Sequence, residues 1–180
     1  MGKFNNMPGV PGFGRGGDYT DEGTYTVEIT NAFKKDSKDP AKAGNVVVIF
    51  EWKFLTSTNE KHKPGTSGSV ARTIKPDPFG YTANDTIRCV YSAVKSKFKD
   101  APAEQKPTEA DVLELSKHLA TALCETDDMA ALDASIKHLA ALGITDVADF
   151  LRGEVVALEV KKGNTKKGGT FSYHNWSPVS

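Results

Sequence analysis

The 180-residue chain has few cysteines, no net charge and no long hydrophobic run. Two cysteines cannot form a disulfide framework, which favours a reducing, intracellular setting. The longest apolar runs, such as Val46–Phe50, are far shorter than the ~20 residues of a membrane-spanning helix. The first residues contain no basic segment followed by an apolar one, so no secretory signal is expected. These absences predict a cytoplasmic protein that makes no contact with a membrane.

Charge is unevenly distributed along the chain although its total is zero. Residues 1–100 contain 15 Lys or Arg and 11 Asp or Glu, whereas residues 101–153 contain 4 and 10. Residues 154–180 contain 4 and 2. A basic part beside an acidic part is typical of a protein that presents one face to a polyanion. Ordinary clustering of surface charge is the alternative interpretation.

Apolar residues alternate in five segments, which predicts five strands. These strands are expected over Thr24–Ala32, Asn45–Thr56, Val70–Ile74, Val155–Lys161 and Thr170–Trp176. The segment Lys34–Gly44 is expected to be a polar turn. Between the third and fourth strands, helical spacing predicts helices that begin near Thr82, Thr108, Met129 and Thr145. Asp85 and Asp111 are placed to complete capping boxes with Thr82 and Thr108, and Gly143 is expected to end the third helix.

This order predicts a mainly β fold with an α insertion, namely a five-stranded OB-type barrel with a helical block between strands 3 and 4. Residues 1–22 are expected to form a flexible Gly-rich tail, because Pro8–Gly17 has no apolar period to bury. Residues 23–180 then form a single OB-type domain whose helical insertion spans about 81–152. The formal G-x-G-x-x-G match at Gly12, Gly14 and Gly17 lacks the flanking strand and helix of a dinucleotide site.

Two parts of the chain carry a resemblance. In Gly153–Pro178, a strand ending in lysines is followed by a Lys/Gly-rich turn and an aromatic strand. Tyr25–Ile29 and Gly44–Lys53 form a comparable first hairpin. Together, over about residues 24–75 and 153–178, they resemble bacteriophage OB-fold single-stranded-DNA-binding proteins. The resemblance implies sequence-nonspecific binding of single-stranded DNA in phage DNA replication or recombination, in the host cell cytoplasm. Many such proteins end in an acidic tail that recruits partners, which the ending Trp176–Ser180 lacks.

Binding of a single strand requires cations that follow the phosphates and exposed rings on which bases stack. The candidate phosphate contacts are Lys53, Arg72, Lys75, Lys161, Lys162, Lys166 and Lys167. The candidate stacking residues are Trp52, Tyr173 and Trp176, with Phe54 and Phe171 as further rings. Trp52 shares a face with Val46 and Val48, so a place in the core is its alternative. Tyr173 and Trp176 lie on opposite faces of their strand, and solubility is the alternative role of the lysines.

An enzymatic function is a weaker hypothesis. Pro76-Asp77 and Glu159-Val-Lys161 formally match the pattern of metal-dependent nucleases, in which two acids hold Mg²⁺ and a lysine orients water. However, four predicted helices separate the two halves, and Pro76-Asp77-Pro78 also suits a turn. The four histidines are scattered, and Cys89 and Cys124 suit buried apolar positions. We therefore expect no catalytic centre, no metal and no cofactor.

The acidic helical block suggests a partner surface. Its Leu and Ala stripes suit packing against the barrel, against a second copy in a homo-oligomer, or against a replication or recombination protein. Its acids should repel DNA, so the block is expected to lie away from the binding groove. The alternative to DNA binding is a protein–protein assembly module in which the barrel serves as a scaffold.

Overall fold

The computed structural model describes residues 20–36, 46–74, 81–124, 128–164 and 170–179. The elements in these ranges are β1 (Gly23–Asp36), β2 (Val46–Ser57), β3 (Ser67–Ile74), α1 (Tyr81–Lys97), α2 (Glu109–Cys124), α3 (Met129–Ala141), α4 (Val147–Leu151), β4 (Val155–Asn164) and β5 (Thr170–Pro178). The predicted order of three strands, a helical block and two strands is confirmed.

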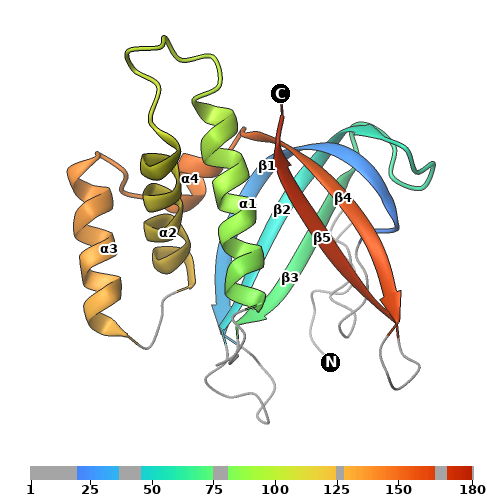
Figure 1. Ribbon diagram of the computed structural model, residues 1–180. Helices are drawn as coiled ribbons and strands as arrows, with labels where there is room; N and C mark the ends of the chain where they lie inside the picture. Colours follow the sequence, from blue (N-terminus) through green and yellow to red (C-terminus); the bar gives the residue numbers. More distant parts are fainter. Residues whose placement is uncertain (1–19, 37–45, 75–80, 125–127, 165–169, 180) are drawn as a thin grey trace.

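The strands form one antiparallel sheet in the order β3-β2-β1-β4-β5. Because β1 pairs with β2 on one side and with β4 on the other, the two strand-forming ends of the chain share this sheet. Register shifts interrupt the pairing of β1 with β2 at Thr26/Val27 and at Ile29/Asn31, and irregularities of this kind bend a strand. Figure 1 shows the resulting curvature, with the β4–β5 hairpin crossing in front of β3.

The sheet is not closed into a barrel, so this part of the predicted fold is wrong. No backbone pairing joins β3 to β5 within the described ranges. Side chains fill the space between the edge strands β3 and β5, which we call the seam. Arg72 of β3 contacts His174 of β5, and Trp52 packs against Trp176 with ring centroids 5.6 Å apart. Helix α1 contacts β3, β4 and β5 along the same seam (Figure 1). These bulky groups keep the two edge strands too far apart for backbone hydrogen bonds.

One hydrophobic core joins the sheet to the helices. The inner faces of β1 and β2 bury large side chains such as Ile29, Phe50 and Trp52. Helix α1 contributes Val90 to the same cluster, and α2 contributes Leu119. The alternation read from the sequence therefore identifies the buried face of the first two strands.

The helices are stacked outward from the sheet. Helix α2 packs on α1, and α3 packs on α2 at the side farthest from the β4–β5 tip (Figure 1). The predicted capping box of α2 is confirmed, since Thr108 N–H donates to Asp111 Oδ2 at 2.9 Å and Asp111 N–H donates to Thr108 Oγ1 at 3.2 Å. Gly143, with φ of 76°, follows the end of α3 as predicted. None of the described helices is long and apolar enough to cross a membrane.

Three boundaries differ from the sequence-based expectation. Strand β1 continues through Lys34 and Lys35, predicted as a turn, because the irregularity near Ile29 lets it keep pairing with β2. Helix α1 begins at Tyr81, and the Asp85 carboxylate contacts Arg72 of β3. Of the predicted tail, residues 1–19 lie outside the described ranges, whereas Thr20 is buried and Asp21 N–H donates to a histidine ring.

Candidate nucleic-acid interface

The outer face of the β4–β5 hairpin presents an exposed ring beside a cation. Lys161 lies directly opposite Tyr173 in the strand register, and Glu159 lies directly opposite Asn175. Because side chains alternate along a strand, these four groups share one face of the hairpin. Tyr173 is 39% exposed. A ring that can stack on a base therefore stands next to a group that can contact a phosphate.

Lys161 also forms an ion pair within this face. Its Nζ lies 2.8 Å from Glu159 Oε1, and Asn175 Nδ2 donates to Glu159 Oε2 at 3.0 Å. The hydrogen bond to Glu159 raises the pKa of Lys161, and the same bond lowers the pKa of Glu159. Lys161 is thus a cation at neutral pH whose charge is partly balanced by the adjacent carboxylate.

Lys162 lies on the opposite face of β4, near the segment that leads into β1. Its Nζ is 3.6 Å from Asp21 Oδ1, and Lys61 Nζ is 3.4 Å from Asp21 Oδ2. Burial acts to raise the pKa of Asp21, but Lys61, Lys162 and His62 together lower it below its ordinary value. Two lysines, Lys61 and Lys162, therefore share the Asp21 carboxylate beside the hairpin.

Arg72 does not lie on an open cationic surface. Its Nε donates to Asp85 Oδ2 at 2.8 Å, and its guanidinium contacts the His174 ring. Burial raises the pKa of Asp85, while Arg72 acts in the opposite direction. Arg72, a predicted phosphate contact, thus forms an ion pair between β3 and α1. Asp85 projects from the first turns of α1 toward β3 and brings its carboxylate to the guanidinium.

Two of the predicted stacking residues lie in the core. Trp52 is 0% exposed and Trp176 is 9% exposed. The two rings meet edge to face, and the second ring also stacks on His174. Phe54, the further ring on β2, is fully buried as well. In this arrangement neither tryptophan offers a free face to a base. Trp52 lies in the core, which was the alternative to a stacking role at this position.

Lys53 is exposed on the outer side of β2, where it lies opposite Glu28 of β1. Lys75, Lys166 and Lys167 lie outside the described residues, as does the side chain of Phe171. The structure thus brings Lys161 and Tyr173 together and leaves Lys53 on the same outer side of the sheet.

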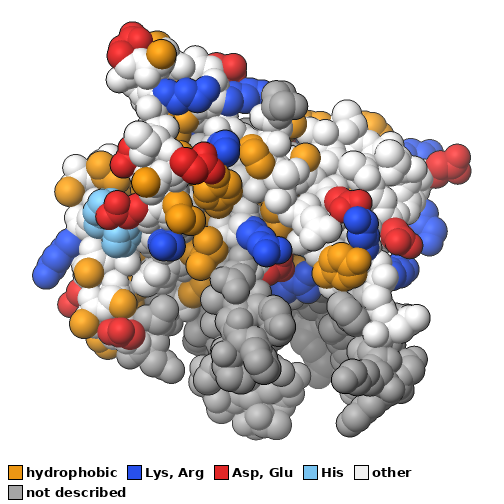
Figure 2. Space-filling model, viewed as in Figure 1, with side chains coloured by type: hydrophobic (Ala, Val, Ile, Leu, Met, Phe, Trp, Pro, Cys, Tyr) orange, Lys and Arg blue, Asp and Glu red, His pale blue; other side chains and the backbone are white. Residues whose placement is uncertain are grey.

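Positive and negative side chains are mixed around the sheet. Figure 2 shows Lys and Arg interspersed with Asp and Glu over the strands, while hydrophobic side chains gather over the helices. Among the described residues, the predicted phosphate contacts therefore include lysines that have acids as neighbours.

Of the residues that match the nuclease pattern, the structure describes Glu159 and Lys161. Asp77 lies outside the described residues. The carboxylate of Glu159 contacts both Lys161 and Asn175 on the outer face of the hairpin. In the structure, the Glu-x-Lys pattern is therefore an ion pair between Glu159 and Lys161 on the outer face of β4.

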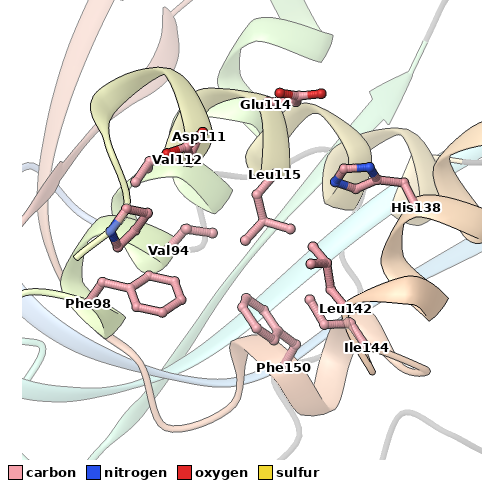
Figure 3. A pocket seen from close by; sticks show the side chains of 11 residues that line it. Val94, Phe98, Asp111, Val112, Glu114, Leu115, His138, Leu142, Ile144 and Phe150 are labelled. Carbon is pink, nitrogen blue, oxygen red and sulfur yellow. The ribbon is translucent and has the colours of Figure 1, made fainter. Parts of the chain in front are cut away.

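The helical block contains a cavity of about 430 Å³ that sequence reasoning missed (Figure 3). Phe98, which follows α1, Leu115 of α2 and Phe150 of α4 form much of its apolar wall, and His138 of α3 lies at its edge. A pocket of this size and lining suits an apolar ligand group or side chain. The sequence signal was weak, because the wall combines residues from separate helices whose mutual placement no single apolar stripe encodes.

The sequence matches no protein-family model and no curated protein sequence.

Proposed function

We propose that this chain binds single-stranded DNA, without preference for sequence, through the outer face of the β4–β5 hairpin. The observation that carries the proposal is the exposed ring of Tyr173 directly opposite Lys161. In the sequence, Lys166 and Lys167 lie between β4 and β5. A stacking platform flanked by cations is the arrangement that sequence-tolerant binding of single strands requires.

The strand arrangement supports this proposal through an OB-type interpretation of the fold. The pairings β1–β2, β2–β3, β1–β4 and β4–β5, with the helices between β3 and β4, follow the OB order. That fold is a partly open barrel, and its loop between the last two strands borders the usual binding surface. Because one fold can serve many functions, the proposal rests on the side chains of the hairpin.

The neighbouring acids fit a binder of moderate affinity. A phosphate that approaches Lys161 competes with Glu159 for the ammonium group, but separating an exposed ion pair costs little. Lys53, Lys162 and Lys61 extend the set of accessible cations over the sheet. Each lysine that contacts a phosphate releases counterions, so the affinity should fall steeply with salt. The setting in phage DNA replication or recombination follows from the sequence resemblance, and the binding needs no cofactor.

Fluorescence-anisotropy titration with labelled single-stranded and duplex oligonucleotides, at two salt concentrations, tests the proposal. We expect tighter binding of the single strand and a marked loss at the higher salt concentration. Tyr173→Ala should weaken binding by about tenfold, because a stacked base contributes roughly 1–3 kcal/mol. Lys161→Ala should reduce the salt dependence, whereas Lys137→Ala on α3 should leave it unchanged. Equal binding of both oligonucleotides, or none, would overturn the proposal.

A second candidate is a protein–protein assembly module, and the helical surface favours it. Leu113, Met129, Ile136 and Leu142 are each at least 40% exposed and all belong to α2, α3 or the residue after α3. Met129 and Ile136 lie seven residues apart, so they share one face of α3. This function predicts self-association or partner binding that high salt does not weaken. Sedimentation analysis of the wild-type chain and of Ile136→Lys at high salt distinguishes it from DNA binding.

A further inference from the structure

Three metal-ligating side chains meet where α2 packs against α3. Glu114 and His118 lie one turn apart on α2, so both project from the same side of that helix. His138 projects from α3, and in Figure 3 its ring points toward α2 beside the cavity. One potential ligand atom from each residue lies within 4.8 Å of the others. The sequence did not reveal this cluster, because the two histidines lie 20 positions apart on different helices.

The two imidazoles are held in a close, defined arrangement. The rings of His118 and His138 stack with centroids 4.1 Å apart and planes inclined by 23°. Nδ1 of His118 is 3.0 Å from the hydroxyl oxygen of Ser135, which is buried on α3. Nε2 of His118 is 4.0 Å from Glu114 Oε1. Ser135 therefore fixes one ring nitrogen, while the other faces the carboxylate.

We propose that Glu114, His118 and His138 bind a divalent transition-metal ion of the zinc class at the α2–α3 interface. Two imidazole nitrogens and one carboxylate oxygen are a donor set that suits Zn²⁺, Co²⁺ or Ni²⁺, whereas Mg²⁺ and Ca²⁺ prefer oxygen ligands. Water would complete the coordination. The serine acts as the outer hydrogen-bond partner that commonly orients a metal-bound histidine.

A turn of at least one imidazole ring separates the observed arrangement from a coordination site. The nitrogen lone pairs lie in the ring planes, so the two stacked rings must leave their stack before both can face one ion. Two ligands about 2.0–2.1 Å from a tetrahedral zinc ion lie about 3.4 Å apart, compared with the 4.0 Å between His118 Nε2 and Glu114 Oε1. Glu114 is exposed and His138 is partly exposed, so these two side chains have room to turn toward His118, which Ser135 holds in place.

The site would join α3 to the rest of the protein. Helix α3 packs mainly against α2, and its outward face carries exposed Met129 and Ile136. A ligand that binds the folded chain and not the unfolded chain stabilises the fold by an amount that grows with the logarithm of its concentration relative to its Kd. Metal binding should therefore raise the thermal stability of the protein and reduce the mobility of α3.

Calorimetric titration of the full chain with Zn²⁺, after treatment with a chelator, tests the proposal. We expect one equivalent to bind to the wild type and to the control Glu104→Gln, which changes an exposed acid outside the cluster. Glu114→Gln and His138→Gln should each weaken the affinity at least tenfold. Zn²⁺ should raise the midpoint of thermal unfolding for the wild type and the control, with a much smaller rise for the two variants.

Co²⁺ absorption provides a second readout that does not depend on stability. The wild type should give the visible bands of Co²⁺ with nitrogen and oxygen ligands, and His138→Gln should lose them while its far-ultraviolet circular dichroism stays the same. No binding, or equal binding by the wild type and both variants, would overturn the proposal. Neither result bears on DNA binding by the β4–β5 hairpin, because the two sites lie on different sides of the molecule (Figure 1).

Discussion

Gly68 lies where the rings of Trp52 and Phe54 leave no room for a side chain. A Cβ at this position would stand 2.5 Å from Trp52 Nε1 and 2.8 Å from two Phe54 ring atoms. Both rings are fully buried, so they cannot move aside freely. We expect Gly68→Ala to lower the free energy of unfolding by about 1–3 kcal/mol, as overpacking does. Urea denaturation measures the change, and Ser69→Ala on the other face of β3 should be nearly neutral. Equal stability of Gly68→Ala and the wild type would contradict the close packing.

Asp85 gives the fold a pH dependence. Burial raises its pKa above the ordinary value of 3.8, and Arg72 offsets this effect only in part. The folded chain therefore binds a proton at Asp85 more readily than the unfolded chain does. This contribution to stability is fully present below the ordinary pKa and is lost as the pH rises through the raised pKa.

Replacement of Asp85 by Asn removes that contribution. As the pH falls from about 7 to about 4, the free energy of unfolding of the wild type should rise relative to that of Asp85→Asn. Urea denaturation at a series of pH values measures this difference, with the exposed Asp100→Asn as a control that should follow the wild type. A difference that stays constant, or that grows with rising pH, would show that Asp85 is not protonated more easily in the fold.

Single positions show where the sequence was informative and where it was not. Alternation along β2 placed Trp52 with the apolar face, and this position is buried. Alternation also placed Arg72 with Val70, but it could not reveal the ion pair with Asp85, which depends on how α1 meets β3. The His118–His138 contact was hidden for the same reason, since two helices must first pack together.

Among the elements, α2 begins at a reciprocal pair of capping bonds. The Thr108 hydroxyl donates to Asp111 Oδ2, as does the Thr108 N–H, and Asp111 N–H donates back to Thr108 Oγ1. The bond from the hydroxyl, followed by the bond from the backbone N–H, lowers the pKa of Asp111. We expect Thr108→Ala to cost about 1 kcal/mol of stability, the usual effect of losing an N-terminal helix cap. Chemical denaturation measures the loss, with the exposed Thr145→Ala as a control. A neutral Thr108→Ala would show that α2 does not depend on its cap.

The order and type of the elements could be predicted because each has a strong apolar period. The extension of β1 through Lys34 could not, since it depends on an irregularity that restores pairing with Val48. The sequence also could not predict whether the sheet closes into a barrel. Whether β3 and β5 pair depends on the bulk of Trp52, Trp176 and α1 at the seam, which is a property of the packed structure.

At the scale of the whole molecule, charged side chains of both signs lie over the sheet, and exposed hydrophobic side chains gather over the helices among charged ones (Figure 2). Helices α2 and α3 lie on the side away from the β4–β5 tip (Figure 1). Two activities could therefore operate without obstructing each other: contact with a polyanion at the strands, and contact with a metal ion or a partner at the helices.

The shared core makes a prediction about unfolding of the entire molecule. The chain has two tryptophans, both buried in the sheet, so their fluorescence reports on the strands, whereas circular dichroism reports mainly on the helices. Because Val90 and Leu119 belong to the same cluster as Trp52, we expect both signals to change at one urea concentration. Leu119→Ala should destabilise the chain by about 2–5 kcal/mol and move both transitions together. If the helical signal were lost first, with fluorescence unchanged, the helical block would be a separate folding unit and the single core would be excluded.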